Sequence, residues 1–376
     1  MVVGATPDEM VKLGFKKIGR DFPVFLHPKT QEEYALARIE KKMARGHDGF
    51  SFDFSSSVTL EQDLFRRDIT INAMAMEDSQ IIDPFNGQDD LKNKIIRHVS
   101  DHFKEDPLRV LRVARFAARF FDFQVHEDTI KIMREISNSG ELQSLSGERV
   151  FMEMEKAMLT PDPSIFFEVL SKCGALEILF PELNALKGIP QTAKYHPEGD
   201  AWTHTLLVLK HACKLSISPE VRFAALLHDL GKAITPKEIL PGHHGHEESG
   251  LSLIENFGKR FKFPNKILDN CLRVCKYHLL CHKVFELRAG TILDLLSGLD
   301  AFRNPENLDL FLICTKSDHL GKLNDSYPQA EYLNRCFDSL RNLDISEATK
   351  LKDPLKIKEK IRDLRIKAIK KVPREF

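Results

Sequence analysis

The sequence predicts a small α/β region at the front of the chain and an all-α region behind it, with the change near residue 100. Short β-like segments alternate with helical ones before that point, whereas the later segments follow helical spacing. Proline and glycine gather at breaks in the second region, at residues 144–147, 180–190 and 235–242. These three observations favour one mixed unit followed by helices.

The α/β region opens on a helix signal. Thr6, Pro7 and Glu9 occupy the positions of an N-cap, a first helical residue and the partner in a capping box. Val2 and Val3 come before this helix and indicate the end of a strand. Further strands are expected at residues 22–26, 33–38, 81–82 and 95–99.

The second region contains eight helical stretches and no convincing strand. In each stretch the apolar residues recur at intervals of three and four. The stretches are residues 106–121, 127–136, 148–159, 163–173, 202–215, 219–231, 247–261 and 265–280. No fixed-period repeat is present, so we expect a globular helical region.

Composition excludes several classes of protein. The chain has 376 residues, 42% of them hydrophobic and 29% charged, which fits two or three folded domains. No apolar run approaches the ~18 residues that cross a bilayer, so no membrane contact is expected. The amino terminus lacks the basic and apolar regions of a secretory signal. The seven cysteines are odd in number and begin at Cys173, which favours the reducing cytoplasm over a disulfide framework.

The zero net charge conceals a basic end. Residues 350–376 hold 11 Lys and Arg against 4 Asp and Glu, so residues 1–349 carry a net charge of −7. A basic segment can bind phosphates and release their counterions, or it can form a solvated helix face. Charge alone favours the solvated face.

An arginine-rich helix follows the α/β region. Four arginines are expected to point away from its apolar face: Arg109, Arg112, Arg115 and Arg119. No acidic residue between Pro107 and Phe121 neutralises them. These guanidiniums therefore either pair with acids from another helix or bind an anion such as a phosphate. Asp106 is either an ordinary cap or, beside an arginine, a group that pairs with a nucleobase edge.

Histidines concentrate in the second half, where 10 of the 15 lie between residues 196 and 319. His204 lies in one helical stretch and the His228-Asp229 pair ends another, so that ligands from separate helices can meet. Imidazole and carboxylate without thiolate suit Mn, Ni, Co, Fe or Mg, with Zn also possible. A divalent ion at this position can activate water for phosphoester hydrolysis. Residues that could complete or border the site are His243, His244, His246, His278 and Asp318. For His211 and His282 we expect ordinary surface or core positions.

A second group resembles a zinc cluster by composition alone: Cys271, Cys275, His278, Cys281 and His282. Its spacing places the group on one continuous helix, whereas structural zinc sites usually draw ligands from two separated pairs. We therefore interpret the cysteines as small buried apolar residues.

Several long motifs, in this order, resemble a known family. RRDITINAMAM (66–76), IIDPFNGQDDL (81–91) and EDPLRVLRVARFAARF (105–120) are similar to the tRNA nucleotidyltransferases that add CCA. The later WTHTLL, LLHDLGK and HHGH segments resemble the HD-domain region of the bacterial multifunctional CCA proteins. The resemblance runs from Val2 to about residue 340 and is less clear beyond it.

The resemblance implies a head, neck, body and tail. Residues 1–100 correspond to an α/β nucleotidyltransferase-like head, and residues 101–190 to an all-α neck and body. Residues 191–330 correspond to the HD phosphohydrolase domain, and residues 331–376 to a basic helical tail. The implied partners are CTP and ATP at the head and neck and tRNA at the body and tail, in a monomer or dimer.

Residue roles follow from the same resemblance. Arg67, Arg112 and Arg115 match arginines that contact the nucleotide, and Asp106 and Arg109 match the pair that reads the base edges of C and A.

In the HD region, His228 and Asp229 match the catalytic signature, and His204 is their implied partner. Together with Asp318 they form the expected metal ligands, for Ni or another divalent ion. The family associates this region with phosphatase, 2′-nucleotidase and 2′,3′-cyclic phosphodiesterase activities.

The sequence departs from the family at its start. Family members begin with a Gly-Gly-x-x-Arg-Asp loop and an Asp-x-Asp pair that holds Mg²⁺ for nucleotidyl transfer. Both motifs precede the segment that matches residues 2–10, and no Gly-Gly occurs in this sequence. We therefore expect an N-terminally truncated head, and negligible CMP or AMP addition by residues 1–376. Two alternatives remain at this point: a stand-alone HD phosphohydrolase and a non-catalytic tRNA-binding remnant.

Overall fold

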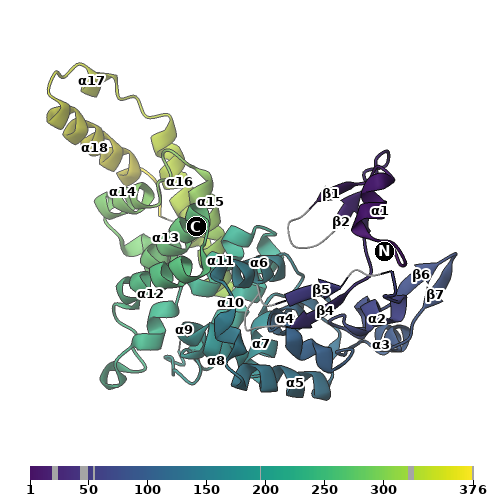
Figure 1. The fold of residues 1–376 in the computed structure, drawn as a ribbon. Coiled ribbons are helices and arrows are strands. Elements are labelled where there is room, and N and C mark those ends of the chain that lie inside the picture. Colours follow the sequence, from purple (N-terminus) through teal and green to yellow (C-terminus); the bar gives the residue numbers. More distant parts are fainter. Residues whose placement is uncertain (19–23, 43–49, 54–55, 195, 321–325, 375–376) are drawn as a thin grey trace. The chain divides into compact units, whose positions relative to one another are not determined.

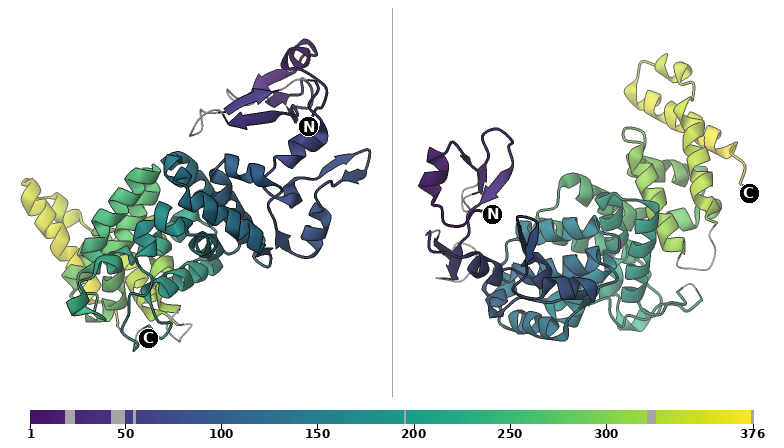
Figure 2. Two further views of the ribbon diagram at one scale, coloured as in Figure 1. Left: turned by 60° about the horizontal axis from the view of Figure 1, so that its bottom comes forward. Right: turned by 90° about the vertical axis from the view of Figure 1, so that its right-hand side faces the viewer.

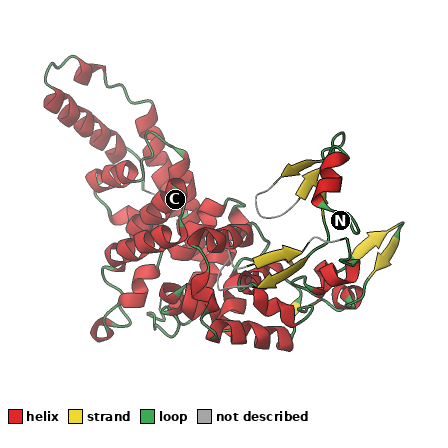
Figure 3. Ribbon diagram, in the orientation of Figure 1, coloured by secondary structure: helices red, strands yellow, loops and turns green. Residues whose placement is uncertain are grey.

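The computed structural model describes residues 1–18, 24–42, 50–53, 56–194, 196–320 and 326–374 (Figure 1). The chain divides into two compact units. Unit 1 comprises residues 1–154 and 165–179, and unit 2 comprises residues 155–164 and 180–376. Unit 1 contains all the strands of the described residues, and unit 2 is helical (Figure 3).

The strands of unit 1 are short and form four small sheets. They are β1 (Lys16–Ile18), β2 (Val24–Leu26), β3 (Glu33–Ala35), β4 (Ile39–Lys42), β5 (Phe50–Asp53), β6 (Ala75–Glu77), β7 (Gln80–Ile82), β8 (Ile95–Ile96) and β9 (Gln124–Val125). One antiparallel sheet has the order β1-β2-β3, while β4-β5 and β6-β7 are antiparallel pairs and β8-β9 is parallel. A small core of Met10, Phe25 and Leu36 lies beside the first sheet.

The helices of residues 1–179 begin with the predicted capping box. Thr6 and Glu9 exchange side-chain and backbone hydrogen bonds at the start of α1, which confirms that prediction. The helices are α1 (Pro7–Lys12), α2 (Leu60–Phe65), α3 (Gly87–Lys92), α4 (Leu108–Arg119), α5 (Glu127–Asn138), α6 (Gly147–Met158), α7 (Ser164–Lys172) and α8 (Ala175–Leu179).

Two strand predictions need correction. No strand was expected after residue 100, yet β9 pairs with β8 because the Gln124 and His126 amides donate to the carbonyls of Lys94 and Ile96. Val2 forms an isolated parallel bridge to Leu36 instead of the end of a longer strand. Part of the strand expected at 22–26 lies outside the described residues.

Unit 2 is built around packed helices (Figures 1 and 2). Helices α11 and α15 contact each other, each also contacts α10 and α13, and α12 packs on α13. Phe223, Val274 and Phe311 are buried among them. The helices are α9 (Pro181–Asn184), α10 (Ala201–Leu215), α11 (Pro219–Leu227), α12 (His246–Phe261), α13 (Asn265–His282), α14 (Ala289–Gly298), α15 (Glu306–Leu320), α16 (Pro328–Arg341), α17 (Ser346–Thr349) and α18 (Pro354–Lys370).

The eight predicted helices are all present, but one ends early. The helix expected to reach residue 231 ends at Leu227, and a short 3-10 helix (Leu230–Ile234) follows it. This break turns the chain directly after His228-Asp229, where the predicted metal ligands lie. No helix among the described residues is both long and apolar enough to cross a membrane.

The basic end of the chain uses several of its charges within the fold. Arg362 on α18 forms a two-pronged ion pair with Asp294 on α14, with N–O distances of 2.6 and 3.0 Å. Arg374 donates to the backbone carbonyls of Phe285 and Leu287. These contacts attach the basic end to α14 and to the segment that precedes it.

The seven cysteines are free thiols, and six of them are buried. Cys271, Cys275 and Cys281 lie on α13, and burial raises the pKa of each thiol. The prediction that these three cysteines are small buried residues is confirmed.

Candidate metal centre and nucleotide pocket

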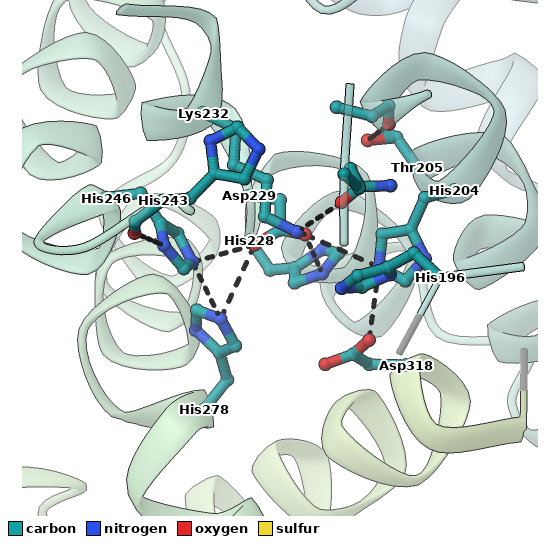
Figure 4. Close-up of polar contacts among 12 residues, drawn as sticks. His196, His204, Thr205, His228, Asp229, Lys232, His243, His246, His278 and Asp318 are labelled. Atoms are coloured by element: carbon teal, nitrogen blue, oxygen red, sulfur yellow. Dashed lines mark hydrogen bonds and ion pairs between the residues drawn. The ribbon is translucent and has the colours of Figure 1, made fainter. Parts of the chain in front are cut away.

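Buried side chains from five helical segments of unit 2 converge around Asp229 (Figure 4). The elements that carry them are separated in sequence but packed together in the core of the unit. The contributors are His204 from α10, His228 and Asp229 directly after α11, His246 from α12, His278 from α13 and Asp318 from α15.

The two carboxylate oxygens of Asp229 face different histidines. Oδ2 lies 3.1 Å from His228 Nε2 and 3.4 Å from His204 Nε2. Oδ1 lies 3.0 Å from His246 Nε2 and 3.4 Å from His278 Nε2. The carboxylate therefore lies between two histidine pairs.

The other ring nitrogens fix the hydrogen positions. The Nδ1 atoms of His228, His246 and His278 lie 2.8, 2.6 and 2.8 Å from the carbonyl oxygens of Ala225, His243 and Cys275. A carbonyl oxygen only accepts, so we assign the hydrogen of each neutral ring to Nδ1. Each Nε2 atom then carries a lone pair that faces a carboxylate. Histidine ligands of metal ions commonly show this arrangement, with the outer nitrogen donating to a carbonyl or carboxylate.

His204 follows the same rule with a carboxylate partner. Its Nδ1 lies 2.6 Å from Glu198 Oε1, and its Nε2 lies 3.1 Å from Asp318 Oδ1. His282 Nε2 lies 2.6 Å from the other oxygen of Asp318 and so orients that carboxylate. Sequence reasoning missed Glu198, which precedes α10 in a loop, and treated His282 as an ordinary histidine.

The electrostatics of the centre favour a cation. Burial lowers the pKa of His204, but hydrogen bonds to the carboxylates around the ring outweigh burial and raise that pKa to about 10. Burial alone would raise the pKa of Asp229, whereas His228 and Lys232 hold it well below its usual value. When no metal ion is bound, the surrounding carboxylates therefore keep the buried His204 ring protonated. Burial alone would favour the neutral ring.

Lys232 and a cavity complete the centre. Lys232 Nζ lies 2.6 Å from Asp229 Oδ2 and 2.6 Å from Gln191 Oε1, and the side chain is buried. A cavity of about 250 Å³ adjoins these groups and is also lined by His246 and Asp318. A small anionic ligand could therefore reach the carboxylates, the imidazoles and the ammonium group together.

The remaining histidines of the region have other roles. His243 uses both ring nitrogens, at 2.8 Å from Thr235 Oγ1 and 3.0 Å from the Pro190 carbonyl, so it offers no free lone pair to this centre. His244 is exposed. His211 Nδ1 lies 3.4 Å from the Ser317 carbonyl, an ordinary contact at a half-buried position.

Gly231 allows the His246 segment to approach Asp229. A Cβ atom at Gly231 would lie 2.0 Å from the His246 carbonyl oxygen and 2.7 Å from the Gly250 amide nitrogen. We expect Gly231→Ala to lower the free energy of unfolding by ~1–3 kcal/mol, as overpacking does in other cores. Urea unfolding measures this change. The matched control is Gly290→Ala on α14, where the nearest atoms are 3.8 Å away and the stability should stay equal or rise; equal effects at both positions would contradict the close approach.

Unit 1 contains a second candidate site, a cavity of about 850 Å³. Four of the predicted nucleotide-binding residues line it: Arg67, Asp106, Arg109 and Arg112. Both oxygens of Asp106 contact Arg149 Nη2, at 3.2 and 3.1 Å. Arg67 is partly exposed and pairs with Asp63 at 2.9 Å.

The arginine face of α4 is more strongly paired than the helix alone predicts. Acids from outside the helix neutralise it: Arg112 pairs with Asp68 at 2.6 Å, and Arg115 pairs with Glu153 at 2.6 Å. Arg109, expected on the arginine face, is buried and donates to the His102 carbonyl at 2.6 Å. Arg115 also lies 4.3 Å from the ring centre of Phe116, a buried residue.

Family models match three consecutive parts of the chain. Residues 9–97 match the poly A polymerase head domain, and residues 122–187 match the probable RNA and SrmB-binding site of polymerase A. Residues 201–296 match the HD domain, which contains five of the six converging metal-centre residues. The fold and the site thus define a nucleotidyltransferase that carries an HD domain.

Curated relatives are similar along most of the chain. The multifunctional CCA protein of Teredinibacter turnerae is 50% identical over 350 residues, which cover 92% of this chain and 85% of the relative. That of Shewanella denitrificans is 51% identical over 353 residues, covering 92% and 86%. The chain therefore belongs to the multifunctional CCA protein family, the CCA-adding tRNA nucleotidyltransferases with an HD domain. A stand-alone HD phosphohydrolase is excluded.

Solved structures share the fold at low identity. A CCA-adding enzyme in complex with ATP superposes with a TM-score of 0.63 and 18% identity, covering 98% of this chain and 80% of that one. The Thermotoga maritima CCA-adding enzyme complexed with tRNA gives a TM-score of 0.57 and 19% identity, covering 98% and 81%. The division into residues 1–100, 101–190, 191–330 and 331–376 stays a prediction.

Proposed function

We propose that unit 2 hydrolyses phosphoesters with a divalent metal ion, and that its substrates are 2′,3′-cyclic nucleotides, 2′-nucleotides and phosphomonoesters. The observation that carries this proposal is the set of histidine Nε2 atoms that face buried carboxylates around Asp229. Such a donor set is poor at binding a neutral ligand and good at binding a cation.

His204, His228, Asp229 and Asp318 are the residues that would hold the ion. A divalent ion, when bound, supplies a water nucleophile whose pKa is lowered toward neutrality. The outer hydrogen bonds to Glu198 and to the Ala225 carbonyl keep the His204 and His228 rings pointed inward. Nickel is one candidate among the divalent ions that this donor set suits.

Lys232 and the adjoining cavity favour an anionic substrate. The buried ammonium group is held by Asp229 and Gln191, so its position is fixed before a ligand arrives. At about 250 Å³ the cavity suits the phosphate end of a nucleotide. Lys232 would attract the phosphoester oxygens. The buried side chains around it limit the access of bulk water.

Metal removal tests this proposal. Dialysis of the chain against EDTA should abolish hydrolysis of 2′,3′-cyclic AMP, because the ligands without an ion hold no activated water. Addition of Ni²⁺, Mn²⁺, Co²⁺ or Mg²⁺ in turn should restore the rate of hydrolysis. Chromatography of the product measures this rate. Circular dichroism before and after dialysis shows whether the fold survives. Folded, metal-reloaded protein that hydrolyses no phosphoester would exclude the proposal.

For unit 1 we infer recognition of CTP and ATP, with tRNA as the acceptor and Mg²⁺ as the ion of nucleotidyl transfer. Two observations support this: the arginine-lined cavity, and solved enzymes of the same fold described with ATP and with tRNA. Calorimetric binding of CTP and UTP to the chain tests nucleotide recognition.

A further inference from the structure

We infer that unit 2 binds a nucleoside polyphosphate in a separate cavity, which lies between α14, α16 and α18. These three helices pack on one another (Figure 1). The cavity has a volume of about 700 Å³, and pockets for small molecules commonly occupy ~300–1,000 Å³. It shares no lining residue with the cavity beside Asp229. The inference therefore does not depend on the proposed hydrolysis.

The charged lining of this cavity is strongly positive. Among the described residues it contains four cations, Arg288, Arg362, Lys370 and Arg374, and a single acid, Asp294. Arg362 already pairs with both oxygens of Asp294, at 2.6 and 3.0 Å. Arg374 donates to two backbone carbonyls, which fix its position but carry no net charge. An excess of positive charge therefore remains around the cavity.

Three polar side chains of the lining have hydrogen-bonding capacity to spare. Arg288 and Lys370 are exposed, and neither forms an ion pair or a side-chain hydrogen bond with the described residues. The Thr291 hydroxyl likewise makes no hydrogen bond with them. A phosphate group accepts several hydrogen bonds at once, and guanidinium and ammonium groups are its usual partners. The cavity thus offers donors to a phosphate without first breaking an ion pair.

An apolar wall favours a nucleotide over an inorganic anion. Ile366, Ile369 and Val372 line the cavity together with Tyr332 from the start of α16. Ile369 and Tyr332 are almost completely buried. Pockets for organic ligands combine such apolar surface with a few polar groups. A nucleoside polyphosphate can place its phosphates beside the cations and its base against this wall.

The competing explanation is a basic surface that contacts the RNA backbone. RNA would use cations spread along α18, including exposed lysines that do not line the cavity, such as Lys367 and Lys371. A ligand inside the cavity would distinguish Lys370 from its neighbour Lys371. The two adjacent lysines therefore provide a matched pair of variants.

The experiment labels the full chain with 8-azido-ATP in the presence of EDTA, which removes divalent ions. After irradiation, mass spectrometry identifies the labelled peptides. We expect labelling around Tyr332 or within residues 366–374, and excess ATP should suppress it. Because a charge-assisted hydrogen bond contributes about a factor of ten in affinity, Arg288→Gln with Lys370→Gln should weaken this suppression tenfold or more. Lys371→Gln should leave it unchanged, and circular dichroism compares the folds of the variants.

Competitors then define the ligand. ATP should suppress the labelling at lower concentration than pyrophosphate, because only ATP also contacts the apolar wall. Labelling confined to other parts of the chain, or labelling that ATP does not suppress, would overturn the inference. Suppression by tRNA that Lys370→Gln and Lys371→Gln weaken equally would assign the surface to RNA and would also overturn it.

Discussion

Replacing His228 and Asp229 together with alanine is expected to abolish metal-dependent phosphoester hydrolysis. Asp229 Oδ2 and the His228 and His204 rings are among the groups that would hold the metal ion. Loss of groups that only orient metal ligands lowers metal affinity or activity ~10–100-fold. Removing two ligands should therefore lower the rate of hydrolysis more than ~100-fold. The rate with 2′,3′-cyclic AMP at saturating Ni²⁺ or Mn²⁺ measures the effect.

The fold should survive this double change. Lys232 keeps its contact with Gln191 Oε1 at 2.6 Å, and His204 keeps Glu198 at 2.6 Å. Loss of Asp229 leaves the buried Lys232 ammonium beside the neutral Gln191 oxygen, which costs stability, so the circular dichroism spectrum of the double variant is compared with that of the unaltered chain. His211→Ala is the matched control, since His211 lies on α10 in the same unit, makes only a backbone contact and does not line the cavity. A folded double variant that retains hydrolysis would show that the centre is not the hydrolytic site.

The His228-Asp229 pair was predictable because its two residues are adjacent and end an apolar helix. Such a pair is visible in the sequence itself, as are the long helices with apolar spacing of three and four. The capping box of Thr6 and Glu9 is likewise a local signal, and the structure contains it. Features that depend on neighbouring residues in the chain are the ones that sequence reasoning recovers.

The rest of the centre depends on tertiary packing. His278 lies among cysteines on α13, and the spacing of that helix indicates only that one face is buried. Its approach to Asp229 requires α12 and α13 to pack together, with Gly231 close to the backbone of α12. Glu198 is in a loop, where no periodicity marks its contact with His204.

Strand β9 was not predicted, for a related reason. β8 and β9 have two residues each and are defined by backbone pairing between segments about thirty residues apart. Two residues cannot display the alternation that marks a strand. The pairing of Arg112 with Asp68 was equally hidden, because the helical wheel of α4 contains no information on acids brought from another segment.

Asp106→Ala is expected to relax the choice of nucleotide in unit 1. If the Asp106 carboxylate reads the base edges of C and A, its loss should reduce the preference for CTP and ATP over UTP and GTP. Base-edge hydrogen bonds contribute ~1–3 kcal/mol of discrimination, which corresponds to about 5- to 150-fold in the ratio of dissociation constants. Competition binding of the four nucleotides to the chain measures this ratio.

Arg149→Ala separates the two roles that the Asp106 carboxylate could have. In the structure both Asp106 oxygens contact Arg149, and Oδ1 also accepts from the Leu108 amide at 3.0 Å. Arg149→Ala removes the ion pair but keeps the carboxylate and its contact at the start of α4. If Asp106 reads the base, Arg149→Ala retains the preference for CTP and ATP while Asp106→Ala loses it. Equal loss in both variants would instead assign Asp106 to holding the cavity wall, and an unchanged preference in Asp106→Ala would remove the residue from base recognition.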